Sequence, residues 1–232
     1  MSNPETKTVA TAAATASGAH EAHEHAHYTT TGLNHRKIAM WAFIGSECML
    51  FGSLISTYLI YKGRSVVGPF PHEAWTSPTG QVFKPILNIP VTSMSTFVLL
   101  MSSLFMVLAL AAVENRGKPG YEGLLGSSKF WLAATAAAGA TFLGFQAYEF
   151  TSFVHEGLTI RTNLFGTSFY TLTGFHGTHV AVGVLWLMTM LFIDVKRGLM
   201  PKDAINIDIM ALYWHFVDVV WIAIFTLVYL IK

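Results

Sequence analysis

The sequence predicts an all-α membrane protein, a bundle of five transmembrane helices with the N-terminus in the cytoplasm and the C-terminus outside. Of its 232 residues, 53% are hydrophobic and 12% are charged, which is about half the charge of an ordinary soluble domain. The mean hydropathy is +0.48. The apolar residues fall in five long blocks, and none of these blocks contains a Lys or an Arg. A soluble fold and a low-charge disordered chain are therefore both excluded.

Each block is long enough to cross about 30 Å of hydrocarbon at about 1.5 Å per helical residue. The predicted spans are Ile38–Tyr61, Ile86–Val113, Phe130–Val154, Thr167–Val195 and Ile207–Ile231. Gly, Pro and charged residues gather in the breaks between them. Residues 1–37 are rich in Ala, Thr, Ser and His, so we expect a disordered tail followed by one membrane domain at 38–232. No segment of the tail has the features of a cleavable signal peptide, so the first span is expected to serve as an anchor.

The distribution of Lys and Arg predicts the orientation. With five spans, nine of these residues fall on the side of the N-terminus and five on the opposite side, which places the N-terminus in the cytoplasm. The net charge of +1 and the lack of a basic cluster argue against nucleic-acid binding. The single Cys48 excludes an internal disulfide and a thiolate zinc site, and we expect it to be a small core residue. The four His of the tail segment HEAHEHAH are expected to be solvated rather than to bind a metal.

Small residues repeat along two of the spans and predict close helix packing. Ala136, Ala140 and Gly144 form a stripe at i, i+4 and i+8 of the third span. Gly174, Gly177 and Ala181 form a similar stripe at i, i+3 and i+7 of the fourth. We favour packing inside this chain's own bundle, with an intersubunit face as the alternative. The odd number of spans and the lack of an internal repeat argue against a transporter built from inverted halves.

Several polar residues lie inside the predicted spans, where an ionisable group costs about 2.5–3.5 kcal/mol at the centre of a helix. No Lys or Arg is available there to pair with the carboxylates, so these must be protonated or hydrogen-bonded. Depth along the helices makes Glu149 level with His176, and His179 level with Asp218. We therefore expect a polar seam through one half of the bundle, formed by Gln146, Glu149, His176, His179, His215 and Asp218.

Three interpretations of these intramembrane groups remain open. The favoured one is a hydrogen-bonded network that fixes the rotation of the helices. A metal or haem site is the weakest, because three His on two helices are few for a redox centre. The third is proton handling, which rests on Glu47. This carboxyl lies near the middle of the first span among apolar neighbours, which favour its protonated form, and a structural role for it is equally well supported.

Four segments give the chain a family resemblance. YWHFVDVVWIAIFTLVYL at 213–230, FYTLTGFHGTHVAVG at 169–183, FQAYEF at 145–150 and FIGSECMLFGSLISTY at 43–58 resemble subunit III of haem-copper terminal oxidases. The likeness runs from about residue 37 to the C-terminus, in the family's order. It implies a non-catalytic subunit of a proton-pumping oxidase that reduces dioxygen to water, in a bacterial plasma membrane. Such a chain would be inactive alone and would carry no haem or copper, these centres belonging to partner subunits.

The resemblance also implies partners and roles. The implied partners are oxidase subunits I and II, a possible small subunit IV, phospholipid, cytochrome c as donor to the complex, and a possible respiratory supercomplex. The family stabilises subunit I and supports proton uptake, and its carbodiimide-reactive Glu corresponds to Glu47. This chain matches a short bacterial form, because the first two of the family's seven helices have no counterpart. Electron donation by quinol is the alternative to cytochrome c, and a self-contained membrane metalloenzyme or a small transporter are more distant alternatives.

Overall fold

The computed structural model describes residues 34–66, 68–76, 80, 82–83 and 85–231. The chain divides into two compact units between Trp41 and Ala42, and the packing described below concerns the second of them. Most of the predicted tail lies outside the described residues. Its last residues, from His35 onward, already belong to the first helix.

Five long helices confirm the predicted fold class. They are α2 (His35–Tyr61), α3 (Ile89–Glu114), α4 (Ser128–His155), α5 (Leu164–Arg197) and α6 (Ala204–Phe225). A short 3-10 helix, η1 (Pro201–Asp203), precedes α6, and a π-helical turn, η2 (Thr226–Leu230), extends it. All five are long and apolar enough to cross a membrane. The loop after α2 contains two antiparallel strands of two residues each, β1 (Trp75–Thr76) and β2 (Val82–Phe83), which were not predicted from the sequence.

Side-chain caps explain where the helices begin. The side chains of Asn88, Ser127 and Asn163 accept hydrogen bonds from the first-turn N–H groups of α3, α4 and α5. The second span therefore begins at Ile89 rather than at the predicted Ile86, since Pro90 is favoured in the first turn of a helix. Gly198, with a φ of +72°, ends α5 in a conformation that favours glycine.

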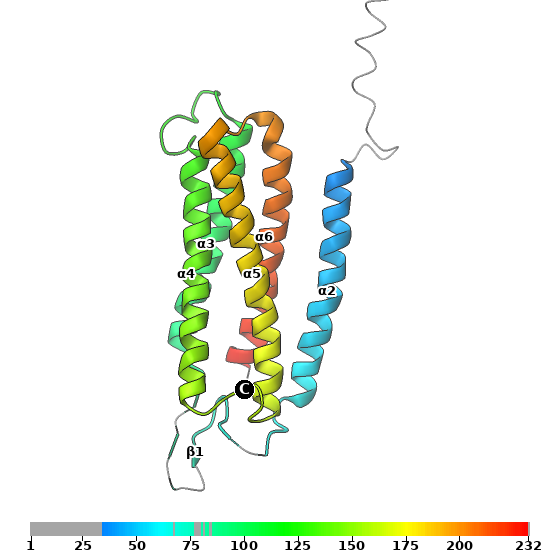
Figure 1. The fold of residues 1–232 in the computed structure, drawn as a ribbon, viewed down its shortest axis with the longest axis vertical. Helices are drawn as coiled ribbons and strands as arrows, with labels where there is room; N and C mark the ends of the chain where they lie inside the picture. Colours follow the sequence, from blue (N-terminus) through cyan, green and yellow to red (C-terminus); the bar gives the residue numbers. More distant parts are fainter. Residues whose placement is uncertain (1–33, 67, 77–79, 81, 84, 232) are drawn as a thin grey trace, which may run out of the picture. The chain divides into compact units, whose positions relative to one another are not determined.

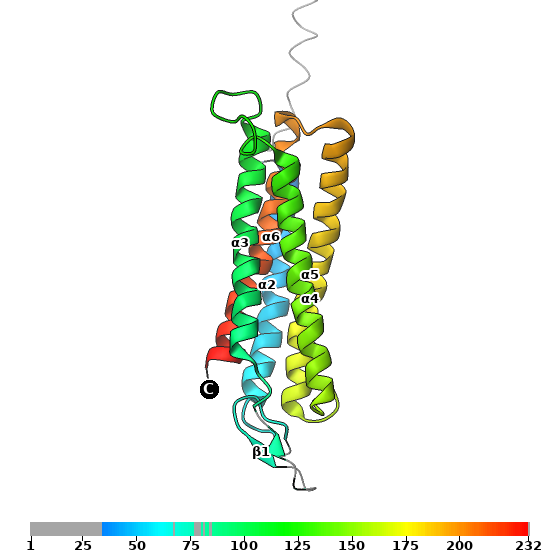
Figure 2. The same ribbon diagram turned by 90° about the vertical axis from the view of Figure 1, so that its left-hand side faces the viewer.

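Helices α3 to α6 form a four-helix bundle in which α3 packs against α4 and α6, and α5 packs against the same two helices (Figures 1 and 2). Trp214 of α6 is fully buried at its centre. Two glycines make room for its ring: a Cβ on Gly139 would lie 2.6 Å from the indole, and one on Gly183 would lie 2.7 Å from it. The core is thus built around one large side chain and two positions that accept only glycine without displacement.

Residues 42–61 of α2 contact the bundle through a narrow stripe of large side chains, Ile44, Phe51 and Tyr58, at intervals of two turns. The Phe51 ring lies 6.2 Å from that of Phe216 on α6, and the Tyr58 ring lies 6.3 Å from that of Phe165 on α5. Most of this helix is exposed, and Cys48 is among its exposed residues. The prediction that Cys48 is a core residue is wrong, because Cys48 does not lie on the buried face of α2.

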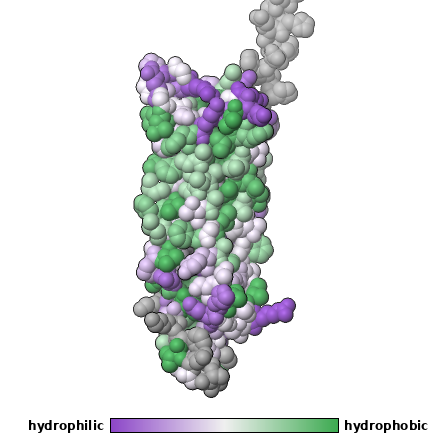
Figure 3. Space-filling model, turned by 60° about the vertical axis from the view of Figure 1, so that its left-hand side comes forward, coloured by the Kyte–Doolittle hydropathy of each residue, from purple (hydrophilic) through white to green (hydrophobic). Residues whose placement is uncertain are grey.

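The surface agrees with a bundle surrounded by lipid. On the face drawn in Figure 3, apolar side chains cover the middle of the helices and hydrophilic ones gather towards the two ends. Exposed apolar residues occur on every one of the five helices. In water this surface would be unfavourable, whereas in a bilayer it meets hydrocarbon.

Candidate functional site

The structure pairs two intramembrane residues that are far apart in the sequence. Oε2 of Glu47 on α2 lies 3.1 Å from Nε2 of His179 on α5, and each side chain is 16% exposed. Glu47 therefore has a hydrogen-bond partner inside the span. The predicted pairing of His179 with Asp218 is wrong, because His179 meets α2 whereas Asp218 lies beside Ser103 of α3.

A count of hydrogens shows what this pair holds. Nδ1 of His179 lies 2.8 Å from the carbonyl oxygen of Phe175, and because a carbonyl only accepts, Nδ1 must carry a hydrogen. A hydrogen bond between Nε2 and Glu47 then needs one further proton, carried either by the carboxyl or by the imidazole. In both forms the pair is neutral overall and holds one transferable proton. Its loss would leave a carboxylate facing an imidazole lone pair.

Neighbouring side chains fix the position of His179. The Phe51 ring meets its imidazole edge-on at 5.0 Å between centroids, and the Tyr213 hydroxyl donates to the His179 carbonyl oxygen at 3.0 Å. The two rings come from α2 and α6, the helices on either side of this part of α5. The imidazole is therefore held towards Glu47 by packing as well as by its own hydrogen bonds.

His176 lies one turn before His179 and belongs to the core. It is fully buried between the rings of Phe142 and Trp221, whose centroids lie 5.7 Å and 4.8 Å from its own. Its Nε2 donates to the carbonyl oxygen of Val217 at 3.2 Å. These contacts fit the structural interpretation of the seam. The predicted pairing of His176 with Glu149 is wrong, because each of the two side chains has other partners.

Glu149 is buried at 7% exposure and interacts with two hydroxyls. It is hydrogen-bonded to Thr92 of α3, and the Tyr229 hydroxyl donates to its Oε2 at 3.3 Å. Gln146, on the same face of α4, donates to the Thr173 carbonyl oxygen at 2.8 Å. These contacts join α4 to α3, α5 and η2, so the residues of the predicted seam are brought to helix interfaces but not to one another.

The remaining two seam residues face α3. His215 Nδ1 lies 2.5 Å from the Ser103 hydroxyl, which also stands beside Asp218. The Asp218 carboxyl is 3% exposed, and neither of its oxygens has a hydrogen-bond partner of good geometry among the described residues. A buried, unpartnered carboxyl favours the protonated form.

Hydroxyl groups of α3 bind α6, a contact that was not predicted from the sequence. The indole N–H of Trp221 donates to Thr96 Oγ1, and that of Trp214 donates to Ser102 Oγ, each at 2.9 Å. The signal was present, since Thr92, Thr96 and Ser103 recur at i, i+4 and i+11 and so share one helix face. The indole N–H groups of the two tryptophans in the last span need acceptors when buried, and Thr96 on this face and Ser102 beside it supply them.

The small-residue stripes were predicted only in part. Ala136 is buried, but Ala140 and Gly144 are exposed on α4, and a Cβ on Gly144 or Gly174 would meet no atom within 4 Å. Gly177 does allow a close contact, because a Cβ there would lie 2.6 Å from Oε1 of Gln146. The prediction of close packing inside the bundle is therefore wrong for Ala140, Gly144 and Gly174. On α4 the close contact is made by Gly139, next to Ala140.

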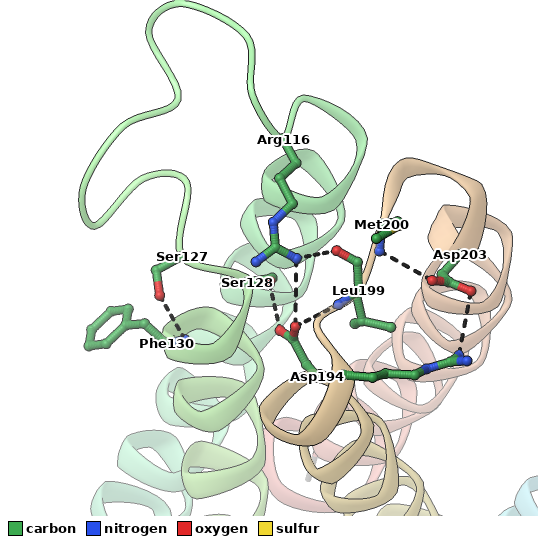
Figure 4. Close-up of polar contacts among 9 residues, drawn as sticks. Arg116, Ser127, Ser128, Phe130, Asp194, Leu199, Met200 and Asp203 are labelled. Carbon is green, nitrogen blue, oxygen red and sulfur yellow. Dashed lines mark hydrogen bonds and ion pairs between the residues drawn. The ribbon is translucent and has the colours of Figure 1, made fainter.

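A polar cluster around Asp194 joins the helices at the end of the bundle that carries the α3–α4 loop, and it was not predicted from the sequence (Figure 4). The Asp194 carboxylate at the end of α5 is fully buried and lies 3.8 Å from the Arg116 guanidinium. It accepts hydrogen bonds from the Ser128 hydroxyl at 2.5 Å and the Leu199 backbone N–H at 2.8 Å. Arg116 also donates to the Leu199 carbonyl oxygen. The ends of α3, α4 and α5 are thereby joined through one carboxylate.

Comparison with known proteins decides the family. Residues 10–232 match the family model described as cytochrome c oxidase subunit III. The chain belongs to this family. It is 40% identical to cytochrome c oxidase subunit 3 of Bacillus sp. (strain PS3) over 193 residues, which are 83% of this chain and 84% of the relative. It is 37% identical to quinol oxidase subunit 3 of Bacillus subtilis, over 83% of this chain and 85% of the relative.

A third relative is cytochrome bo(3) ubiquinol oxidase subunit 3 of Pseudomonas aeruginosa, 33% identical over 91% of this chain and 92% of the relative. The family and the five apolar helices make this chain subunit III of a haem-copper oxidase, a multi-pass membrane protein within an oxidoreductase complex. Membership in the family implies assembly with other oxidase subunits. The resemblance of the four segments is thus confirmed.

Proposed function

We propose that this subunit III is a non-catalytic part of a cytochrome c oxidase that stabilises subunit I, binds phospholipid and supports proton uptake. Its partners would be subunits I and II, with a possible small subunit IV and a possible supercomplex. Haem and copper would be carried by the partners rather than by this chain. In support, His176 and His215 are engaged by a carbonyl and a hydroxyl.

The proposed location is the plasma membrane of a bacterium, with the N-terminus in the cytoplasm. The excess of Lys and Arg on the side of the N-terminus supports this orientation. In this orientation the Asp194 cluster lies at the cytoplasmic ends of the helices. The Glu149 end of α4 faces the outside.

The observation that carries the role in proton uptake is the contact between Glu47 and His179. The pair is held at 3.1 Å and is partly accessible at the edge of the bundle, so it can release its one proton, which leaves a single carboxylate charge, and take the proton up again to become neutral. Most of the other acidic groups in the spans lack this property, because Glu149 is bound by hydroxyls and Asp218 is enclosed. We therefore assign proton handling to Glu47 with His179 as its partner.

Electron donation by cytochrome c is proposed over donation by quinol. Support comes from the resemblance of the segment LTIRTNLFGTSFYTLTGFHG at 158–177 to cytochrome c oxidase members of the family. Relatives named for both donors match this chain at similar identity, so quinol oxidase is the second candidate. The purified complex decides between them: it should consume oxygen with reduced cytochrome c and not with quinol, and the opposite result would select the alternative.

The non-catalytic role is tested by removing this chain from the complex. The depleted complex should keep its initial rate of oxygen consumption but inactivate after fewer turnovers, and adding the chain back should restore the lifetime. The isolated chain should be colourless. A stoichiometric haem on the isolated chain, or loss of all initial activity on depletion despite intact haem in the partners, would contradict the proposal.

A further inference from the structure

Two polar atoms in the core of the bundle have no hydrogen-bond partner among the described residues. They are Oε1 of Gln146 on α4 and Nδ1 of His176 on α5. Both residues are enclosed, at 7% and 0% exposure. Leaving a buried polar atom without a partner is costly, so buried groups of this kind are nearly always hydrogen-bonded. The two atoms therefore need a partner.

The hydrogen bonds on the other side of each group make both atoms acceptors. Nε2 of Gln146 donates to the Thr173 carbonyl oxygen at 2.8 Å, and turning the amide over would set Oε1 against that oxygen. Nε2 of His176 lies 3.2 Å from the carbonyl oxygen of Val217 and so carries a hydrogen. In the neutral imidazole, Nδ1 then has only a lone pair. Neither acceptor can supply the hydrogen that the other needs.

The two acceptors lie in the same part of the interface between α4 and α5. The Gln146 amide contacts α5 at the Thr173 carbonyl and at Gly177, where an added Cβ would lie 2.6 Å from Oε1. His176 precedes Gly177 in the chain. Its ring meets that of Phe142 edge-on, and Phe142 lies one turn before Gln146 on α4. The amide and the imidazole are therefore neighbours across the interface.

A protonated His176 could satisfy both atoms, because its Nδ1–H could donate to Oε1 of Gln146. This form would place a net charge in a fully enclosed position. Glu149, one turn along α4, is already engaged by two hydroxyls, and Asp218 lies beside Ser103 of α3. A buried charge without a counter-ion costs far more than an ordered water molecule. The neutral imidazole with an external donor is therefore favoured.

We propose that one ordered water molecule binds between α4 and α5 and donates its two hydrogens to Gln146 Oε1 and His176 Nδ1. Water is the smallest ligand with two donors, and buried waters typically serve such otherwise unsatisfied groups. The bridge completes a chain of hydrogen bonds from the Thr173 carbonyl through Gln146, the water and His176 to the Val217 carbonyl on α6. It joins three helices one turn from His179 and keeps His176 neutral.

A structure of the intact oxidase complex, at a resolution that shows internal waters, tests the site directly. A density peak is expected within about 2.7–3.2 Å of both acceptor atoms. The absence of a peak where other internal waters are visible would overturn the proposal. Direct contact between Oε1 of Gln146 and Nδ1 of His176 at hydrogen-bond distance would also overturn it, because that contact requires the protonated imidazole.

Radiolytic labelling of the intact complex in ¹⁸O-water provides a second test, because hydroxyl radicals formed at a bound water modify the side chains beside it. The Trp221 ring lies 4.8 Å from that of His176 and should take up the label. Trp214 is the internal reference, since it is equally buried on α6 and its indole also donates to a hydroxyl of α3. Equal labelling of the two tryptophans would contradict the site.

Matched variants tie the labelling to the amide. Gly177→Ala displaces the Gln146 amide from α5, whereas Gly174→Ala, one turn earlier, meets no atom within 4 Å. Gln146→Leu removes the acceptor. Labelling of Trp221 should fall severalfold in Gly177→Ala and Gln146→Leu and stay unchanged in Gly174→Ala, with haem content as the check on assembly. Unchanged labelling in the first two would overturn the proposal. If they do not assemble, the comparison of Trp221 with Trp214 in the parent complex decides.

Discussion

The Asp194 carboxylate, fully buried at the end of α5, lies 3.8 Å from the Arg116 guanidinium beyond the end of α3. The same carboxylate accepts hydrogen bonds from Ser128 at the start of α4 and from Leu199 after α5. Three helix ends are held by one side chain. This cluster sets the positions of α3, α4 and α5 relative to one another at this end of the bundle.

Asp194→Ala should destabilise the chain by about 3 kcal/mol, the lower end of the range for a broken buried ion pair, because Arg116 remains partly hydrated. The change leaves the Ser128 hydroxyl and the Leu199 N–H without their acceptor. The measurement is thermal unfolding of the complex in detergent. Asp203→Asn is the control, since it weakens the pair with Arg197, whose side chain is 63% exposed, and should cost at most about 1 kcal/mol. Equal effects of the two changes would contradict the role of the cluster.

The two glycines that flank Trp214 give a second prediction. Gly139→Ala and Gly183→Ala each place a Cβ within 2.8 Å of the indole, and overpacking of this kind costs about 1–3 kcal/mol. Gly144→Ala and Gly174→Ala meet no neighbour and should be neutral or stabilising by up to about 1 kcal/mol through helix propensity. Stability in detergent should therefore separate the four variants into two pairs. If all four behave alike, the close approach at Trp214 is not what these glycines provide.

The hydrogen bond between α3 and α6 at Trp221 gives a third. Thr96→Val keeps the size of the side chain but leaves the buried Trp221 N–H without an acceptor, at a cost of about 1–3 kcal/mol. Thr57→Val on α2 is the control, because the Thr57 hydroxyl binds only the backbone of its own helix. Unfolding in detergent and retention of the chain in the complex are the measurements. No difference between the variants would argue against the α3 hydroxyls as a packing device.

A fourth prediction concerns chemical labelling. A hydrophobic carbodiimide applied to the intact complex should modify Glu47 before the other intramembrane acids of this chain. Glu47 is 16% exposed at the edge of the bundle, whereas Glu149 and Asp218 are enclosed at 7% and 3%. Peptide mapping after limited labelling provides the measurement. Preferential labelling of Glu149 or Asp218 would show that the role of the family's reactive Glu does not transfer to Glu47.

The sequence predicted the five spans because composition and block length alone determine which segments can cross a bilayer. It did not predict which polar groups meet, since depth along a helix is readable from residue numbers and rotation about its axis is not. His176 and His179 illustrate the difference: they are one turn apart, yet one is enclosed by Phe142 and Trp221 and the other turns to Glu47. Asp194 was missed for another reason. It lay inside an apolar block, and its partner Arg116 lay in a loop some 80 residues earlier.

The central claim is that Glu47 and His179 hold one transferable proton that the oxidase uses. Glu47→Gln tests it most directly, because the amide keeps the size and a hydrogen bond to His179 while removing the titratable proton. The measurement is proton pumping per electron, with the number of turnovers before inactivation, in vesicles that contain the reconstituted complex. We predict normal assembly and a nearly normal initial rate of oxygen consumption, with lower pumping efficiency or a severalfold shorter lifetime. A variant that pumps and lasts as long as the parent would reduce the pair to a structural contact and contradict the claim.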